Sequence, residues 1–369
     1  MLQSMSKIIV IGSGIVGSTI AYELSHNPHL DITLIDEKNP GTGATGAALG
    51  ILMGIISHKT KGKAWRLREA SIKRYDTLIP ELETLTGLQI PYNKQGIVKL
   101  LFADDDLSKW EKLAQVRSNQ GYDLFVWSCD ELKNRCPEVN VDGLLGAVYS
   151  PCDRQINPTF LTKALVKGAS LKGVHCIFGE KVISLTTVDE GNNRYCREVK
   201  LETRSIDADW VILATGLGTS PLIESLGSNI MVAPVLGQAL LLKHSSWQIK
   251  DNFSPVITGN DIHIVPMAND ELWLGATVEF PDNVGETIPN EELLKNLQQK
   301  AIEFCPSLAD APIMLSWTGK RPRPEGKSAP IIEKLDNYDN IILATGHYRN
   351  GILLAPATAL SILELLTTT

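Results

Sequence analysis

Apolar and polar positions along the first forty residues predict a strand, a tight turn, a helix and a second strand. The run KIIVI at 7–11 is apolar and β-branched, and it leads into the glycine-rich stretch GSGIVG. A helical repeat of apolar positions follows from about residue 15, and the run DITLIDEK at 31–38 returns to a strand pattern. This order of elements is typical of the first half of a dinucleotide-binding domain.

Two later apolar runs end in the same three residues. WVILATG at 210–216 and NIILATG at 340–346 are near copies, and neither alternates between apolar and polar positions. Unbroken apolar runs of this length fit strands that are covered on both faces of a parallel sheet. Ligands of such sheets bind beyond the carboxyl ends of the strands. We therefore expect Gly216 and Gly346 to face the same crevice as Gly12.

Between these two strands the pattern changes to alternation with a period of two. The segment DIHIVPMANDELWLGATV at 261–278 predicts a hairpin with Asn269 and Asp270 in its turn. One amphipathic stretch interrupts this region and predicts a helix that Asn290 caps. Another β-rich stretch, at about 95–150, contains a helical pattern of its own. These segments indicate an antiparallel, β-rich unit that is separate from the nucleotide-binding strands.

The changes of pattern divide the chain into two interleaved domains. Helices are expected near 105–121 and at 157–171, the second capped by Asn157. The expected fold class is α/β plus α+β, with an antiparallel β-rich domain inserted into a Rossmann-like nucleotide-binding domain. The nucleotide-binding domain would consist of residues 1–90, 150–225 and 321–369, and the inserted substrate-binding domain of residues 91–149 and 226–320.

Composition and charge narrow the possible partners. The 369 residues are 43% apolar and 21% charged, as in an ordinary globular protein, and this length favours two domains. The net charge is −7, from 35 basic and 42 acidic residues, and the basic residues are scattered. We therefore expect neither a nucleic-acid nor a membrane partner. We also expect no apolar run of transmembrane length, and a cytoplasmic location.

The cysteines give no sign of a metal site. Six are present, without a C-x-x-C motif and without a cluster of cysteine and histidine at the spacing of metal ligands. In a chain of this length they are expected to be reduced thiols, and a structural disulfide is the lesser alternative.

The glycine-rich stretch has the spacing Gly12-x-Gly14-x-x-Gly17. In this motif the first glycine makes the turn, the second lets the backbone approach a pyrophosphate, and the third lets the helix pack closely on the strand. Asp36 lies near the spacing of the carboxylate that accepts ribose hydroxyls, which favours an unphosphorylated adenosine. The alternative is a set of packing glycines with a surface aspartate. That alternative would not explain why strand, turn, helix and acid are all in register.

The segment after Asp36 favours FAD over NAD. An NAD enzyme would be expected to continue with another strand and helix, whereas PGTGATGAALGIL at 40–52 consists of small residues that lead into an apolar turn. Such a segment suggests backbone that lies against a larger cofactor. A flexible surface loop would fit the beginning of this segment but not its apolar end.

Five motifs spread over nearly the whole chain carry a family resemblance: GSGIVGSTIAYEL, DRQINPTFLTKAL, GATVE, GKRP and GHYRNGILLAPAT. With them the chain resembles the D-amino-acid oxidase superfamily of FAD enzymes, and within it the glycine oxidases of thiamine biosynthesis. Covalent members of this superfamily attach the flavin through a cysteine. Nothing in this sequence suggests such a cysteine, so the resemblance implies non-covalent FAD.

The glycine-ended strands and the resemblance together give a set of residues expected at FAD. They are Gly12, Gly14, Ile15, Val16, Gly17, Asp36, Glu37, Ala44, Thr45, Leu49, Gly50, Ile51, Val182, Gly216, Gly346, His347, Tyr348, Arg349, Asn350, Gly351, Ile352 and Leu353.

Two arginines are expected at the substrate. The resemblance places Arg321 of GKRP at the substrate carboxylate, which a fixed guanidinium can bind with two hydrogen bonds. The alternative for Arg321 is a solvated loop charge, which is the interpretation we favour for Arg323. Arg349 would belong to the wall of the site, near the substrate or the flavin. The alternative for Arg349 is an ion pair that ties the two domains together.

The chain departs from the family pattern at one strand. Where glycine oxidases usually carry a tyrosine near the substrate, this chain has His263, and Met267 replaces an arginine. A single histidine in a strand is more often a packed or solvated residue than a catalytic one. Its place on the predicted hairpin could nevertheless put His263 over the flavin, as a third substrate-binding candidate. The departure leaves glycine in doubt as the best substrate.

The resemblance implies oxidative deamination of glycine or another small primary or secondary amino acid. The Cα–H would pass as hydride to flavin N5, and O₂ would then be reduced to H₂O₂ without any catalytic acid or base from the chain. One alternative is a flavin-dependent dehydrogenase of a D-amino or 2-hydroxy acid with another electron acceptor. A further alternative is a flavin-binding protein without turnover. Relatives also suggest a homo-oligomer.

Overall fold

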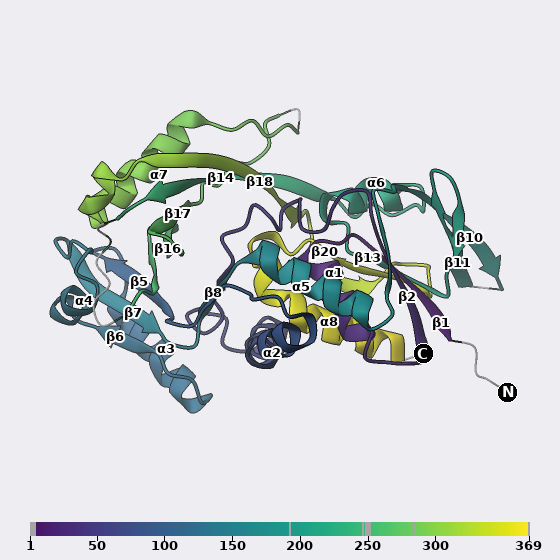
Figure 1. The fold of residues 1–369 in the computed structure, drawn as a ribbon, viewed down its shortest axis with the longest axis horizontal. Helices are drawn as coiled ribbons and strands as arrows, with labels where there is room; N and C mark the ends of the chain where they lie inside the picture. The colour runs from purple at the N-terminus through teal and green to yellow at the C-terminus, as the bar shows by residue number, and fades with distance from the viewer. Residues whose placement is uncertain (1–4, 192, 246, 248–251, 284, 368–369) are drawn as a thin grey trace.

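Two sheets organise the molecule (Figure 1). The computed structural model describes residues 5–191, 193–245, 247, 252–283 and 285–367. A largely parallel sheet and its helices form one half, and an eight-stranded sheet forms the other half. Strands β14 and β18 are long and extend from the second half toward the first.

The first sheet has six strands in the order β19-β20-β13-β1-β2-β9. Their bounds are Ser6–Ile11 (β1), Leu30–Asp36 (β2), His175–Phe178 (β9), Trp210–Leu213 (β13), Ile331–Lys334 (β19) and Ile341–Thr345 (β20). All neighbours in this sheet are parallel except β19 and β20. The two near-identical runs are β13 and β20, which are neighbours, and β13 also pairs with β1. This confirms the predicted convergence of three glycine-ended strands.

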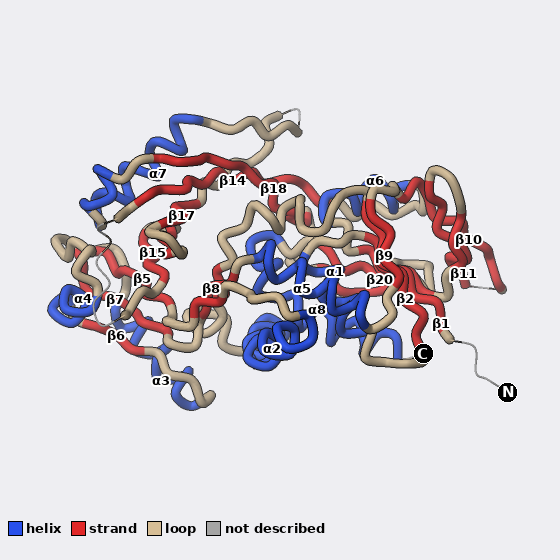
Figure 2. Tube along the Cα trace, viewed as in Figure 1, coloured by secondary structure: helices blue, strands red, loops and turns tan. Residues whose placement is uncertain are grey.

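Both faces of the first sheet are covered, which explains why its strands do not alternate. Ile8 and Val10 pack into a core with four helices, and Ile9 and Ile11 pack into a second core on the opposite face. The helices are α1 (Ile15–Leu24), α2 (Gly62–Thr86), α5 (Pro158–Leu171) and α8 (Gly351–Thr367). They gather together in the middle of the molecule (Figure 2). Parallel strands with apolar side chains on both faces require this kind of double cover.

The opposite face is covered by a small antiparallel sheet that the sequence did not reveal. Its strands are β10 (Val182–Glu190), β11 (Asn193–Leu201) and β12 (Ser205–Asp207), in that order. Leu185, Cys196 and Val199 of this sheet pack against Ile9 and Ile11. Helix α6 (Thr219–Glu224) contributes Ile223 to the same core.

The second sheet has the strand order β18-β14-β17-β16-β15-β5-β7-β6. Its strands are β5 (Ile97–Phe102), β6 (Phe125–Trp127), β7 (Leu144–Ser150), β14 (Val232–Lys243), β15 (Val256–Gly259), β16 (Ile262–Pro266), β17 (Glu271–Gly275) and β18 (Ile313–Pro324). Only β5 and β15 are parallel neighbours in this sheet. Helices α3 (Leu107–Asn119), α4 (Cys129–Arg135) and α7 (Glu291–Phe304) flank it. A short sheet of β3 (Ile51–Leu52), β8 (Arg154–Ile156) and β4 (Tyr92–Asn93) lies in the connecting segments.

The local predictions for this region are confirmed. Strands β16 and β17 form the predicted hairpin, and Asn269 and Asp270 take φ values of 60° and 55° in its turn. Asn and Asp tolerate the left-handed region better than other residues with side chains. Asn157 and Asn290 cap α5 and α7 through their side-chain oxygens. The exact division into two domains stays a prediction, since β18 runs across the expected boundary at 320 and 321.

The expectation that no apolar run reaches transmembrane length is wrong for the C-terminal helix. The stretch Tyr348–Thr367 is long and apolar enough to cross a membrane by length and composition alone. Helix α8 packs against α1 and α2, and its residues 352–357 are buried. Burial between other helices is a sufficient reason for this apolar composition. All six cysteines are free thiols, as expected.

Candidate cofactor and substrate site

A cavity of about 1030 Å³ lies between the carboxyl ends of β1, β13 and β20 and one face of the eight-stranded sheet. This volume is at the upper end of the range for small-molecule and cofactor sites. Of the residues expected at FAD or substrate, all line the cavity except Gly17 and Leu353. Gly17 packs against Gly12, where a Cβ would lie 1.8 Å from the Gly12 carbonyl oxygen. Leu353 is a buried core residue.

The N-terminus of α1 opens into the cavity and fits a pyrophosphate. Gly14 is the N-cap residue and makes no side-chain hydrogen bond to the helix. The Ile15 amide donates to the Thr45 hydroxyl at 3.0 Å, and a Cβ on Gly14 would lie 3.3 Å from that same oxygen. Helix N-termini favour anions because their first N–H groups lack helical partners. A glycine at this position leaves the approach to those groups open.

Asp36 ends β2 at the edge of the cavity, but its carboxylate also has a structural task. One oxygen accepts hydrogen bonds from the Ser13 amide at 2.6 Å and the Ser13 hydroxyl at 2.9 Å. The other oxygen accepts from the Lys38 amide at 2.9 Å. The carboxylate therefore fixes the glycine turn to the end of β2. A carboxylate has about four lone-pair sites, so this geometry leaves room for a ribose hydroxyl.

The loop between β20 and α8 brings polar backbone to the cavity. Gly346 has a φ of 65° and Tyr348 a φ of 53°, and the turn Tyr348–Asn350 leads directly into α8. The imidazole of His347 points into the helix, where Nε2 lies 2.9 Å from the Thr358 hydroxyl. Burial lowers the pKa of His347 to about 4, so this side chain is neutral at pH 7. His347 therefore lines the cavity, but its imidazole is already hydrogen-bonded to Thr358.

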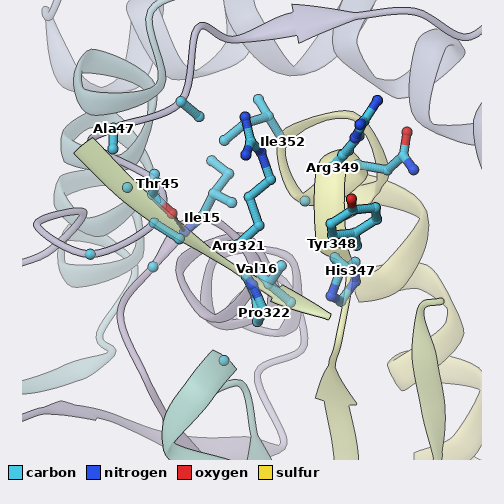
Figure 3. Close-up of a pocket in the computed structure, with 18 of the residues that line it drawn as sticks. Ile15, Val16, Thr45, Ala47, Arg321, Pro322, His347, Tyr348, Arg349 and Ile352 are labelled. Atoms are coloured by element: carbon cyan, nitrogen blue, oxygen red, sulfur yellow. Dashed lines mark hydrogen bonds between the residues drawn. The ribbon is translucent and has the colours of Figure 1, made fainter. Parts of the chain in front are cut away.

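Arg321 is the cation best placed to bind a ligand. It projects from β18 into the space between the Thr45 side and the Tyr348 side of the site (Figure 3). One nitrogen, Nη1, donates to the carbonyls of Leu236 at 3.2 Å and Thr277 at 3.1 Å. Among the described residues, Arg321 forms no ion pair with a carboxylate, and burial lowers its pKa. A partly buried guanidinium without a counter-ion is costly unless a ligand supplies the negative charge.

Gly237 makes room for the Arg321 guanidinium. A Cβ on Gly237 would lie 2.3 to 2.6 Å from the guanidinium atoms. Pro322 follows Arg321 and lines the same cavity, whereas Arg323 is exposed and lies 5.4 Å from the Phe280 ring centroid. This geometry is in line with the ligand-binding interpretation of Arg321 and the surface interpretation of Arg323.

Arg349 has the ion pair that the alternative interpretation anticipates. Its Nη1 lies 3.5 Å from Oδ2 of Asp261, and both side chains are exposed, 42% and 80% respectively. Asp261 belongs to the turn between β15 and β16, so the pair joins the loop before α8 to the eight-stranded sheet. Arg349 also lines the cavity, so it lies at the wall of the site with its charge already paired.

His263 faces the cavity as a neutral ring. Its Nδ1 is buried and has no hydrogen-bond partner among the described residues. Burial lowers the pKa of His263 to about 4, and the charges of Arg349, Lys99 and Arg321 act in the same direction. Met267, the other departure from the family pattern, packs in an apolar cluster with Leu49 and is not among the residues that line the cavity.

Strand register places one further cation beside His263 that sequence reasoning missed. Lys99 of β5 is paired with Thr258 of β15, and Thr258 is paired with His263 of β16. Paired residues point to the same face of a sheet, and all three line the cavity. The parallel pairing of β5 with β15 joins segments about 160 residues apart in the chain. No local pattern could have indicated it.

A buried carboxylate and a buried guanidinium hold the loop at residues 54–59, part of which forms another wall of the cavity. The carboxylate of Asp153 accepts hydrogen bonds from the amides of Gly54, Ile55 and Ile56 at 2.7 to 2.9 Å. Arg117 is fully buried and donates to the carbonyls of residues 55, 57 and 59. Burial raises the pKa of Asp153 and lowers that of Arg117 to about 10. Neither residue was a candidate from the sequence.

The family model described as FAD dependent oxidoreductase (DAO) matches residues 7–365. The chain belongs to this family. Within the FAD-dependent oxidoreductases, it is 30% identical over 351 residues to the glycine oxidase of Bacillus licheniformis, covering 95% of this chain and 90% of that protein. The match over both chains confirms the resemblance to glycine oxidases and the FAD dependence that it implied.

Two solved structures show how widely this FAD-dependent oxidoreductase fold is used. Glycine oxidase from Bacillus cereus ATCC 14579 superimposes with a TM-score of 0.85 at 22% identity, covering 99% of this chain and 96% of that one. L-proline dehydrogenase from P. horikoshii gives the same TM-score at 21% identity, covering 100% and 94%. These similarities confirm the expected fold class, with its Rossmann-like FAD domain.

Proposed function

We propose that this FAD-dependent oxidoreductase oxidises glycine or another small amino acid with a primary or secondary amine. Arg321 carries the proposal, because its guanidinium enters the cavity without a carboxylate partner among the described residues. The expected products are a 2-oxo acid, ammonia or an amine, and H₂O₂, formed from substrate, O₂ and water. Thiamine biosynthesis is the pathway that the resemblance implies, and it belongs to this proposal.

Features at opposite ends of the cavity fit non-covalent FAD. The open N-terminus of α1 with Gly12 and Gly14 would hold the pyrophosphate, and Asp36 would accept from the adenosine ribose. Val182 also lines the cavity, and in this proposal it would lie beside the adenine. The N-terminus of α8 lies beside the remaining space, where its dipole favours negative charge. When bound, FAD supplies the acceptor for the Cα hydride and transfers the electrons to O₂.

The chain's own part in the reaction is to hold the substrate and exclude water. Arg321 would bind the carboxylate through the guanidinium nitrogens that Leu236 and Thr277 leave free. His263 is neutral at pH 7 and lines the cavity, so its ring would form part of the wall beside the substrate. With the carboxylate held beside this wall, the Cα–H has a restricted orientation in the cavity. Fixing distance and angle is the main contribution that a protein makes to such a step.

The main alternative to this proposal concerns the electron acceptor, which could be a carrier in place of O₂. A dehydrogenase on the same fold would bind its substrate in the same way and pass electrons to a carrier. Anaerobic mixing of the purified holoenzyme with glycine, sarcosine, D-alanine or D-proline tests both steps through the flavin absorbance. Bleaching followed by rapid recovery in air is the expected result. Bleaching without recovery would indicate a dehydrogenase, and no bleaching by any amine would contradict the proposal.

Replacing Arg321 tests the carboxylate contact directly. We expect Arg321→Met to lower kcat/KM for the best amino acid about 100-fold, mainly through KM, because a charge-assisted, two-pronged contact is lost. The melting temperature should change little, since a partly buried charge without an ion pair is removed while the carbonyls of Leu236 and Thr277 lose one donor. The control is Arg323→Met, two residues along the same strand, which should leave both quantities unchanged. A fall in melting temperature with unchanged KM would assign Arg321 a structural role instead.

A further inference from the structure

The substrate end of the cavity has more basic side chains than an amino-acid carboxylate needs. Lys99, Arg321 and Arg349 line this end. The acids that act on these cations and on His263 are Asp261 and the buried Glu279, whose carboxylate accepts hydrogen bonds from Gln238, Thr277 and the Asn290 amide. The Arg349–Asp261 pair, 3.5 Å apart, balances its own charges. Arg68 also lines the cavity, and it interacts with the buried carboxylate of Asp153. Arg321 and Lys99 are left without an ion pair among the described residues, and the carboxylate of a simple amino acid would pair with only one of them.

The ammonium of Lys99 is held in place without a counter-ion. It lies 5.7 Å from the centre of the Trp110 ring, and Trp110 lines the cavity too. Among the residues that the structure describes, no hydrogen bond or ion pair joins Lys99 to a carboxylate. Lys99 is half-buried on β5, so the surrounding water stabilises its charge less than at an exposed position. The aromatic ring compensates only in part.

His263 lies between the two unpaired cations. The row Lys99–Thr258–His263 crosses three neighbouring strands, and Arg321 approaches the same ring from β18. The positive charges of both Lys99 and Arg321 help to keep this ring neutral. A substrate whose carboxylate is at Arg321 would extend along the ring toward Lys99. A neutral imidazole between two cations suits the uncharged middle of such a substrate.

We infer that the preferred substrate carries a second anionic group, which Lys99 binds at the far end of the substrate cavity from Arg321. The substrate class is an amino acid whose nitrogen or side chain ends in a carboxylate or a similar anion. The inference rests on the proposed oxidase function for its catalytic consequence, but the anion subsite exists independently of turnover. Lys99 is a specificity-determining residue in this scheme and takes no part in the oxidation.

Achiral N-substituted glycines test the inference without a question of stereochemistry. The series is N-carboxymethyl, N-(2-carboxyethyl) and N-(3-carboxypropyl) glycine, each compared with its primary amide of equal size. We expect kcat/KM of the holoenzyme to favour the acid over the amide by about 10-fold or more at the chain length that spans the two cations. Equal values at every length would overturn the inference.

Substitution of Lys99 provides a second test of the inferred anion subsite. Lys99→Met should bring the acid-to-amide ratio to about one, mainly by lowering kcat/KM for the acid, and Lys99→Arg should keep most of the ratio. The control is Lys112→Met, an exposed lysine on α3 outside the cavity. If Lys99→Met folds poorly, as shown by a lower flavin content, Lys99→Gln replaces it. A ratio that survives the loss of the lysine would assign the preference elsewhere and overturn the inference.

A binding measurement separates this inference from the proposed function. Glutarate and its monoamide cannot be oxidised as amines, but a ligand beside the flavin shifts its absorbance. We expect glutarate to bind the wild-type holoenzyme about 10-fold more tightly than the monoamide, and Lys99→Met to bind the two equally. If no amine reduces the flavin but this difference remains, the subsite stands and the oxidase function falls. If amines reduce the flavin but glutarate has no advantage, the opposite holds.

Discussion

Two histidines of the site, the buried His347 and the half-buried His263, are neutral because the protein surrounds them with apolar groups or with positive charge. His347 is 3% exposed and bonded to Thr358, and His263 faces two arginines and a lysine. Burial lowers the pKa of each ring to about 4, below the ordinary value of 6.5. Each ring therefore remains an uncharged hydrogen-bonding group throughout the physiological range. The same shift couples the stability of the fold to acid.

Acid should destabilise the protein between about pH 6.5 and pH 4. In this window the unfolded chain takes up a proton on His347 while the folded protein does not, so the free energy of unfolding falls as the pH falls. Above pH 6.5 the ring is neutral in both states and contributes no pH dependence. One such histidine accounts for up to about 3 kcal/mol. Urea unfolding at pH 7.5, 5.5 and 4.5 measures the slope.

The slope of stability with pH, and not its absolute value, is the diagnostic quantity. His347→Gln should flatten the acid limb because the titrating group is gone, even though the contact with Thr358 changes as well. His29→Gln, at an exposed position, should leave the slope as it is in the wild type. An unaltered acid limb in His347→Gln would mean that His347 titrates equally in the folded and unfolded states.

At the scale of elements, the wall formed by residues 53–58 depends on a side chain from another part of the chain. Arg117 of α3 donates to the carbonyl of Ile55 at 2.7 Å and to that of Ser57 at 2.6 Å, and its guanidinium lies 3.8 Å from the centre of the Trp65 ring. Gln120 adds an acceptor at 2.6 Å. These bonds satisfy a buried cation and shape a segment that has little regular structure of its own.

Loss of the Arg117 contacts should both weaken the fold and loosen the site. We expect Arg117→Met to lower the free energy of unfolding by about 3 kcal/mol, since several buried carbonyls lose their donor. KM should rise as well, because Ile56 and Ser57 line the cavity. Urea unfolding and steady-state kinetics measure the two effects. Arg135→Met, at an arginine whose side chain is 53% exposed, is the control and should cost less than about 1 kcal/mol.

The elements that could be predicted are those whose signals are local. Gly12, Gly14 and Asp36 are parts of one continuous motif, and Asn290 directly precedes the helix that it caps. The small sheet β10–β12 was not predicted. It covers one face of the six-stranded sheet, and no single residue in the sequence indicates that role. Helix α2 was also not predicted, although it supplies Arg68 to the cavity.

The parts of the site that escaped prediction depend on contacts between distant segments. Lys99 reaches the cavity because β5 pairs with β15, and Asp153 holds amides that lie 97 to 99 residues earlier in the chain. A sequence shows which side chains can bind an anion, but pairing of remote strands determines which ones meet. Arg321 could be predicted only because the family resemblance places it at the substrate carboxylate.

At the scale of the whole molecule, the cavity separates the two sheets, so an occupant contacts both. The parallel sheet contributes the ends of β1, β13 and β20, and the eight-stranded sheet contributes Thr258, His263 and Arg321. A cofactor that fills this space binds the folded protein and not the unfolded chain. Binding of that kind stabilises the folded state in proportion to the logarithm of ligand concentration.

Removal of FAD should therefore lower the melting temperature of the protein as a whole. We expect added FAD to restore it in a concentration-dependent way, with about 2.7 kcal/mol of stabilisation at 100 times the Kd. NAD, which shares the adenosine and pyrophosphate but lacks the flavin, is the control ligand and should have a much smaller effect. A melting temperature that does not respond to FAD would place the cofactor's contacts outside the cavity.

The strand order of the first sheet has a consequence for how the protein is made. Strand β1 emerges from the ribosome early, but its neighbour β13 begins at residue 210, and β20 begins at residue 341. During translation the nascent chain therefore holds an open sheet edge until β13 has been made, and again until β20 has been made. Helix α8, which packs on α1, is made later still. Cofactor loading must accordingly wait until β20 and the start of α8 have been made, so a flavin-bound molecule is one whose synthesis has passed residue 351.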